Sequence, residues 1–176
     1  MENRKIRVGI THGDINGVGY EVILKTFSDP TMLELCTPVV YGSPKVAAYH
    51  RKAMEIQTSF SIVNSAEEVQ DGRVNVVNCI EEELKVELTK PTPEAGKAAL
   101  AALERALADY REGLFDVLVT APINKHTIQS DAFHFPGHTE YIEERVGGGQ
   151  KALMILLKGD FRVALVTGHV RARHCR

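Results

Sequence analysis

One apolar stripe of small residues limits the fold more than any other pattern in the sequence. It lies between Pro93 and Gly113, and its members recur at the three- and four-residue spacing of a helix face. The stripe consists of Ala95, Ala98, Ala99, Ala102, Leu103, Ala106, Leu107 and Tyr110. Gly113 is a typical residue just past a helix end, and a short apolar run, 116–120, follows. We predict a closely packed helix that leads into a fully buried strand.

Strand and helix also alternate before this helix. Residues 4–11 alternate as a strand, residues 18–27 carry apolar side chains at helical spacing, and a short strand at 38–41 precedes a helix from Pro44 toward Ile56. Further β-type segments are expected at 60–63, 74–77, 85–88, 152–157 and 162–166. This order predicts an α/β fold, with a parallel-rich α/β/α sheet and a β-rich excursion between about Phe60 and Leu88. We expect the strands at 116–120 and 162–166 to share one domain.

Composition excludes several classes of protein. The chain has 176 residues, of which 44% are hydrophobic, and it shows no repeat or low-complexity linker, so one domain is the simplest division. Its 21 basic and 23 acidic residues are interspersed and give a net charge of -2, which disfavours nucleic acid or an anionic membrane as partner. No apolar run approaches the roughly 20 residues that span a bilayer. We therefore expect a cytoplasmic protein.

Most cysteines and histidines give no sign of a site. Cys36, Cys79 and Cys175 are odd in number and form no C-x-x-C pair, which argues against a disulfide framework or a thiolate zinc site. Five histidines lack a supporting motif, and we expect them to be surface or turn residues: His12, His50, His126, His134 and His174.

Two other histidines stand in positions typical of ligand sites. His138 and Thr139 open a predicted helix, where the Thr139 hydroxyl and free backbone N–H groups can hold an anion. His169 follows the apolar run 163–166, and the carboxyl end of a strand is where α/β proteins usually bind ligands. Neutral imidazole is also the commonest metal ligand. The alternative for each histidine is a capping or hydrogen-bonded residue without a ligand.

The glycine-rich loop after the first strand matches neither the dinucleotide fingerprint nor the Walker phosphate loop. One interpretation is that its glycines serve only a tight turn. The alternative is that Asp14 and Asn16 face the same cleft as the later motifs, with Asp14 making no direct contact with the ligand. Lys125 lies in a loop after the predicted strand at 116–120. It is either a cation that attracts a phosphate or carboxylate, or a solvated loop lysine.

Four motifs occur in an order that resembles one enzyme family. They are Gly9-Ile10-Thr11-His12-Gly13-Asp14-Ile15-Asn16-Gly17-Val18-Gly19, Thr120-Ala121-Pro122-Ile123-Asn124-Lys125, Pro136-Gly137-His138-Thr139-Glu140 and Val163-Ala164-Leu165-Val166-Thr167-Gly168-His169. Together they resemble the 4-hydroxythreonine-4-phosphate dehydrogenase family of vitamin B6 biosynthesis, from Lys5 to His169. The resemblance implies an architecture like that of isocitrate and isopropylmalate dehydrogenases, here truncated.

The resemblance also implies a chemistry. In the family, the residues matching His138 and Thr139 contact the phosphorylated substrate, and the residue matching His169 is one of three histidines that hold a divalent metal (zinc, magnesium or cobalt). The family oxidises 4-phosphooxy-L-threonine with NAD or NADP, and the product then loses carbon dioxide. The resemblance also implies that the full-length form is a homodimer. Catalytic and cofactor-binding residues remain unassigned in this sequence.

The resemblance stops after Val170. Family members continue well beyond this point, and the other metal histidines and most dinucleotide contacts lie in that later part. We expect residues 1–170 to be the amino-terminal portion of such a dehydrogenase and residues 171–176 to be an unrelated tail, with uncertain activity for this chain. Two alternatives remain: a dehydrogenase of a related sugar-acid 4-phosphate (erythronate or threonate), and a non-catalytic fragment that binds a phosphorylated ligand.

Overall fold

The computed structural model describes residues 5–166, and the chain divides into two compact units between Pro136 and Gly137. The first unit contains β1 (Ile6–Thr11), α1 (Gly19–Thr26), α2 (Pro30–Leu35), β2 (Cys36–Gly42), α3 (Pro44–Ala53), β3 (Phe60–Val63), the 3-10 turn η1 (Ala66–Glu68), β4 (Val74–Asn78), α4 (Pro93–Arg111) and β5 (Val117–Thr120). The second unit contains α5 (His138–Val146), β6 (Ile155–Lys158) and β7 (Phe161–Ala164). None of the helices within 5–166 is long and apolar enough to cross a membrane.

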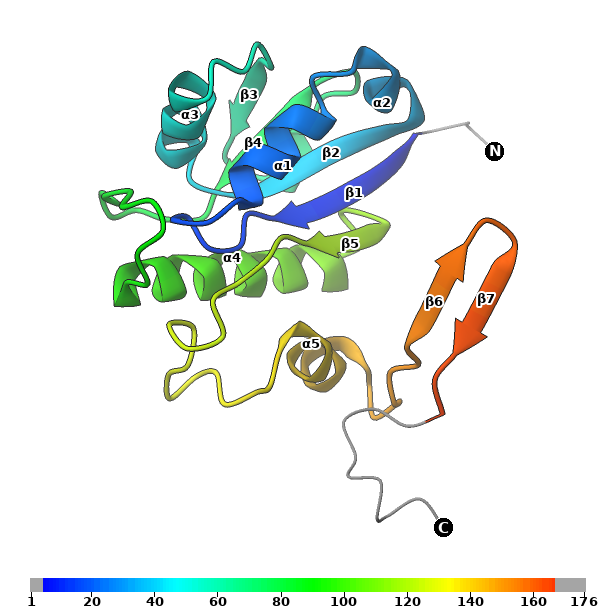
Figure 1. Cartoon of the computed structure of the whole chain (residues 1–176). Helices are drawn as coiled ribbons and strands as arrows, with labels where there is room; N and C mark the ends of the chain where they lie inside the picture. The colour runs from blue at the N-terminus through cyan, green and yellow to red at the C-terminus, as the bar shows by residue number, and fades with distance from the viewer. Residues whose placement is uncertain (1–4, 167–176) are drawn as a thin grey trace. The chain divides into compact units, whose positions relative to one another are not determined.

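A five-stranded parallel sheet organises the first unit. Its strand order is β3-β4-β2-β1-β5, and every neighbouring pair is parallel. Helices α1 and α3 cover one face of this sheet and α4 covers the other (Figure 1). The predicted α/β class, with a parallel-rich sheet between helices, is confirmed.

The central strand β2 is buried on both of its faces. Val40 packs in a cluster with Ile23 of α1 and Val46 of α3, whereas Val39 packs in a second cluster with Ala102 of α4. Successive side chains of a strand point to opposite faces, so one apolar run supplies both layers. Such continuous apolar runs are typical of parallel strands covered on both sides.

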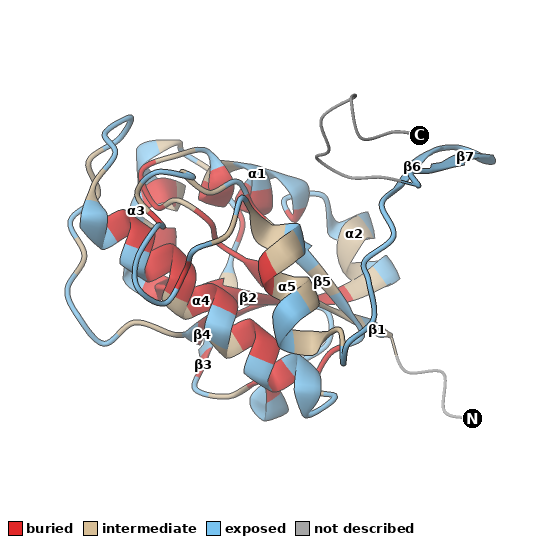
Figure 2. Cartoon of the chain, turned by 90° about the horizontal axis from the view of Figure 1, so that it is seen from below, coloured by how far each residue is buried: buried red, intermediate tan, exposed pale blue. Residues whose placement is uncertain are grey.

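Helix α4 forms as the small-residue stripe predicts. Thr92 caps its start, since the Thr92 side chain accepts a hydrogen bond from the backbone N–H of Ala95, and Pro93 occupies the first turn. The stripe is buried apart from Tyr110 at its end (Figure 2). After the helix, Gly113 adopts a φ of 73°, which a glycine reaches without strain.

Three strand predictions need correction. Residues 85–88 form no strand, because their segment is held by side-chain hydrogen bonds instead of a ladder. Strands β3 and β4 belong to the main sheet, so they are no separate excursion. Strand β5 is not fully buried: Val117 and Val119 are 48% and 47% exposed. The reason is topological, since within the described chain β5 pairs only with β1 and forms an edge of the sheet.

Strands β6 and β7 form a hairpin of their own. They pair antiparallel around Gly159 and Asp160, and Gly159 has a φ of 55°. The expectation that the strands near 116–120 and 162–166 share one domain is therefore wrong, because β5 and β7 lie in different sheets and different units. A two-residue turn favours local pairing, and the apolar pattern of a strand does not specify its partner. The predicted division at residue 170 lies outside the described residues and stays a prediction.

Candidate functional site

The topology of the sheet marks one place for a ligand. Strand β1 lies between β2 and β5; the chain passes through α1 to reach β2, but it reaches β5 only after α4 on the opposite face. The carboxyl ends of β1 and β5 therefore flank a topological switch point, where open α/β sheets usually bind ligands. The loops that leave the sheet there are residues 12–18 and 121–129.

Backbone contacts join these two loops. The N–H of Asp14 donates to the carbonyl of Pro122 at 2.9 Å, and the N–H of Ala121 donates to the carbonyl of Thr11 at 3.1 Å. Gly13 of the first loop has a φ of 71°, and a β-carbon there would overlap the carbonyl oxygen of Pro122 in the second loop. The glycine is thus needed for the close approach of the two loops.

Asn16 has a structural role in this arrangement. Its side chain is buried; the Nδ2 group donates to the carbonyl of Lys90 (2.9 Å) and to Thr92 Oγ1 (3.2 Å), and Oδ1 accepts from the N–H of Glu87 (2.8 Å). These bonds fix segment 87–92 against the first loop. Asp14, whose Oδ1 accepts from the N–H of Asn16, stabilises the turn. The contacts favour the structural alternative for Asn16 over a cleft-facing role.

His12 and His50 are not surface or turn residues, which corrects the prediction. Both are buried, His12 fully; Nε2 of His12 bonds the carbonyl of Ala98 (3.2 Å), and Nε2 of His50 bonds the carbonyl of Ile15 (2.8 Å). Burial lowers the pKa of His12 to about 4 and also lowers the pKa of His50. A signal for His12 was available, because it continues the inward alternation of Val8 and Ile10 on β1. His126 and His134 are exposed, and His174 lies outside the described residues.

Lys125 lies at the start of a turn in the second loop, and its side chain is exposed. The turn is shaped by Asn124, whose Oδ1 accepts hydrogen bonds from the N–H groups of His126 (3.0 Å) and Thr127 (3.3 Å). Beneath it, a β-carbon at Gly96 of α4 would overlap the carbonyl oxygen of Thr127. The loop therefore rests on α4 while Lys125 remains accessible to an anion.

In the second unit, α5 begins at His138 as predicted. Its N-cap is Gly137, which offers no side-chain cap, whereas Ser43 and Thr92 cap α3 and α4 with their side chains. Thr139 is exposed and His138 is half-buried. Gly137 thus makes no side-chain hydrogen bond to the first turn of α5, and the start of a helix is a place where proteins often bind anions.

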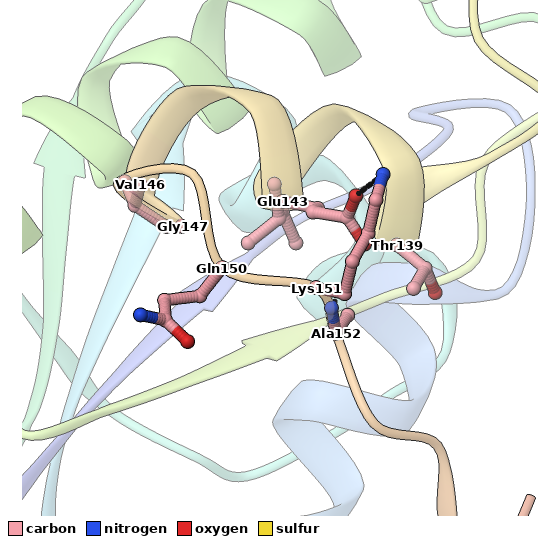
Figure 3. A pocket seen from close by; sticks show the side chains of 8 residues that line it. Thr139, Glu143, Val146, Gly147, Gln150, Lys151 and Ala152 are labelled. Carbon is pink, nitrogen blue, oxygen red and sulfur yellow. Dashed lines mark hydrogen bonds and ion pairs between the residues drawn. The ribbon is translucent and has the colours of Figure 1, made fainter. Parts of the chain in front are cut away.

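A cavity of about 360 Å³ lies beside α5 (Figure 3). Its described lining is Thr139, Ile142, Glu143, Val146, Gly147, Gln150, Lys151 and Ala152. Glu143 Oε1 pairs with Lys151 Nζ at 2.7 Å, and Glu143 Oε2 accepts from the N–H of Ala152 at 2.8 Å. The bond from Lys151 lowers the pKa of the Glu143 carboxyl, and Glu143 raises the pKa of Lys151.

The predicted site residues belong to different units of the chain. Lys125 belongs to the first unit and His138 and Thr139 to the second, so their predicted proximity stays a prediction. His169 lies outside the described residues. Within residues 5–166, no group of three His, Cys, Asp or Glu side chains could hold a metal ion. The described residues thus do not form a metal centre by themselves.

The fold and its switch-point loops define an α/β protein of the doubly wound type, with its ligand edge at the carboxyl ends of β1 and β5. The family model described as "Pyridoxal phosphate biosynthetic protein PdxA" matches residues 34–175. The chain belongs to this family, as its motifs predict.

Named relatives agree with the family. The chain is 74% identical over 173 residues to a 4-hydroxythreonine-4-phosphate dehydrogenase of Bacteroides thetaiotaomicron, covering 98% of this chain and 48% of that protein. It is 31% identical, over 96% of its length and 51% of the relative, to an Oceanobacillus iheyensis protein provisionally named a D-threonate 4-phosphate dehydrogenase. A crystal structure of a 4-hydroxythreonine-4-phosphate dehydrogenase from Burkholderia phymatum matches with a TM-score of 0.82 and 27% identity, over 96% of this chain and 52% of that one. The chain spans about half the length of these relatives.

Proposed function

We propose that this chain forms part of a dehydrogenase that oxidises and decarboxylates 4-phosphooxy-L-threonine in pyridoxal 5'-phosphate biosynthesis. The observation that carries the proposal is the 74% identity to the Bacteroides thetaiotaomicron dehydrogenase across 98% of this chain. The start of α5 supports it, because helix N-termini favour negatively charged groups and Gly137 adds no side-chain cap there, beside His138 and Thr139.

The proposal gives four residues of this chain a role in binding. His138 and Thr139 hold the phosphorylated substrate, and Lys125 attracts its negative charge from the accessible turn after β5. His169 is one ligand of a divalent metal, zinc, magnesium or cobalt, whose other ligands lie outside the described residues. NAD or NADP accepts the hydride. Homodimer formation and a cytoplasmic location belong to the same proposal.

A second substrate has a specific observation in its favour. The Oceanobacillus iheyensis relative is named for D-threonate 4-phosphate, and it is 31% identical to this chain. The two substrates share a four-carbon acid with a terminal phosphate and differ at carbon 2, which bears an amino group in one and a hydroxyl in the other. We favour the amino acid because the more similar relative is named for it.

The test uses both this chain and the full-length Bacteroides thetaiotaomicron relative. In the relative, alanine at the position aligned with His138 should weaken substrate binding by at least about tenfold, roughly 1.4 kcal/mol, while metal binding changes little. Substitution at the position aligned with the exposed His134 is the control. Equal loss of metal and substrate would show that the substrate-binding assignment is wrong.

A comparison of substrates completes the test. NAD(P) reduction by the relative should be faster with 4-phosphooxy-L-threonine than with D-threonate 4-phosphate, and the reverse order would favour the second candidate. For the 176-residue chain, calorimetry with both phosphorylated acids and with NAD and NADP separates the alternatives. Phosphate-ligand binding without dinucleotide binding would favour a non-catalytic binding fragment.

A further inference from the structure

The carboxylate of Glu143 has two partners with different properties. Oε2 accepts from the backbone N–H of Ala152, which is fixed in the chain, and Oε1 accepts from the flexible ammonium of Lys151. The Lys151 side chain is 90% exposed, whereas that of Glu143 is 22% exposed. One oxygen therefore anchors a backbone segment, and the other holds a cation that water already reaches.

The segment that this backbone bond anchors is a run of glycines, which is intrinsically flexible. Gly147, Gly148 and Gly149 follow α5, and the last two have φ values of 56° and 84°. Glycine runs lose much conformational freedom on folding, so the bond from Ala152 to Glu143 closes this turn onto the helix. This bond keeps Lys151 at the cavity whether or not its ammonium stays paired.

Charge is scarce in this cavity. Its walls are mostly apolar, and Glu143 and Lys151 are the only charged side chains among the described residues that line it (Figure 3). Thr139 lines the same cavity one helical turn before Glu143. Lys151 is thus the positively charged side chain of this lining that a phosphorylated ligand held at Thr139 could contact.

We propose that Lys151 is a phosphate-binding residue, whose ammonium exchanges Glu143 Oε1 for a phosphoryl oxygen of the ligand held at Thr139. This inference rests on the proposed function, and it adds a residue and a partner exchange to that site. Glu143 retains its bond to Ala152 throughout the exchange, so only the lysine side chain moves.

The energetics favour the exchange. An ion pair whose lysine is mostly exposed to water contributes little to stability. A phosphate monoester carries a charge of about -1.5 to -2 at pH 7, more than the single charge of a carboxylate. Lysine has a flexible four-carbon stem and is a common phosphate ligand. The negative charge of Glu143 competes with the phosphate for Lys151. Removing the charge of Glu143 should therefore strengthen phosphate binding.

The experiment measures binding of inorganic phosphate and of 4-phosphooxy-L-threonine to the 176-residue chain by calorimetry and by ³¹P NMR. Lys151→Met should weaken binding at least fivefold, Lys151→Arg should retain most of it, and Glu143→Gln should strengthen it about threefold. Glutamine keeps an amide oxygen for the N–H of Ala152, so the turn is retained. Lys158→Met, an exposed lysine of the hairpin, is the matched control and should change nothing; circular dichroism verifies folding of each variant.

The outcomes separate this inference from the proposed function. Unchanged binding in Lys151→Met, combined with loss of binding in Thr139→Val, overturns the role of Lys151 and leaves the proposed function standing. Weaker binding in a folded Glu143→Gln variant contradicts the exchange, because a purely structural pair would give that sign. If the unsubstituted chain binds neither inorganic phosphate nor 4-phosphooxy-L-threonine, the inference is overturned. Turnover by the full-length relative then still decides the proposed function.

Discussion

The imidazole ring of His12 stacks on the phenol ring of Tyr20, with ring centroids 5.3 Å apart and an angle of 13° between the planes. His50 stacks on Tyr20 at 5.5 Å, so the two histidines and the tyrosine form one buried group. Nδ1 of His12 is buried and has no hydrogen-bond partner within the described chain. Burial favours the neutral form of His12, because a charge there would be removed from water.

Acid should destabilise the fold through His12. Its pKa is about 4 when folded and about 6.5 when unfolded, so between these values the unfolded chain binds more protons. The stabilisation is complete above about pH 6.5 and is lost as the pH falls toward 4, by an amount on the order of 3 kcal/mol. His50, whose pKa is also lowered, acts in the same direction. Urea unfolding between pH 7.5 and 4.5 measures this loss.

His12→Gln provides the matched test. Glutamine can donate to the carbonyl of Ala98 but does not titrate. The free energy of unfolding of the His12→Gln variant should therefore fall less steeply as the pH is lowered. His126→Gln, at an exposed position, should follow the unsubstituted chain. Identical pH slopes for His12→Gln and the unsubstituted chain would contradict the assignment.

Tyr41→Phe should destabilise the first unit by about 1–3 kcal/mol. The Tyr41 hydroxyl donates to Asp109 Oδ2 at 2.9 Å, while Arg105 Nε donates to Oδ1 at 2.9 Å. Asp109 is 4% exposed, so loss of the hydroxyl removes a donor from a buried carboxylate. Urea unfolding checks this, with Tyr49→Phe as the exposed control; equal effects of both changes would refute it.

Asn16→Ala should release segment 87–92 from the first loop. The change removes three side-chain hydrogen bonds from a buried position, so unfolding should become easier by about 2–4 kcal/mol. Hydrogen exchange should accelerate at the amide of Glu87, which donates to Asn16. Asn16→Asp keeps the acceptor for that amide but loses both donors, so it should protect Glu87 better than alanine does. Unaltered exchange in Asn16→Ala would be inconsistent with this role.

Gly96→Ala should displace the loop that carries Lys125. A β-carbon at this position would overlap the backbone carbonyl of Thr127, which cannot rotate away as a side chain can. We expect a loss of about 1–3 kcal/mol in chemical unfolding and shifted amide NMR signals across 121–128. Lys97→Ala, on the same helix but exposed, is the control. A fully stable Gly96→Ala variant with unshifted loop signals would contradict the close contact.

Much of the fold follows from local patterns. The small-residue stripe predicts α4 and the Gly-His-Thr motif predicts the start of α5, because helix periodicity and end signals depend on neighbours in the chain. The four ordered motifs likewise indicated the family that the comparison shows. The roles of His138, Thr139 and His169 stay predictions, since they rest on the resemblance.

Only the tertiary structure decided which segments meet. No local pattern places β5 at the edge of the sheet or brings Asn16 to the segment at 87–92. The same holds for His50, whose ring stacks on the buried Tyr20, whereas the alternation on β1 already indicates an inward position for His12. Local sequence determines backbone preference and apolar periodicity, whereas burial and hydrogen-bond partners are set by residues distant in the chain that folding brings together.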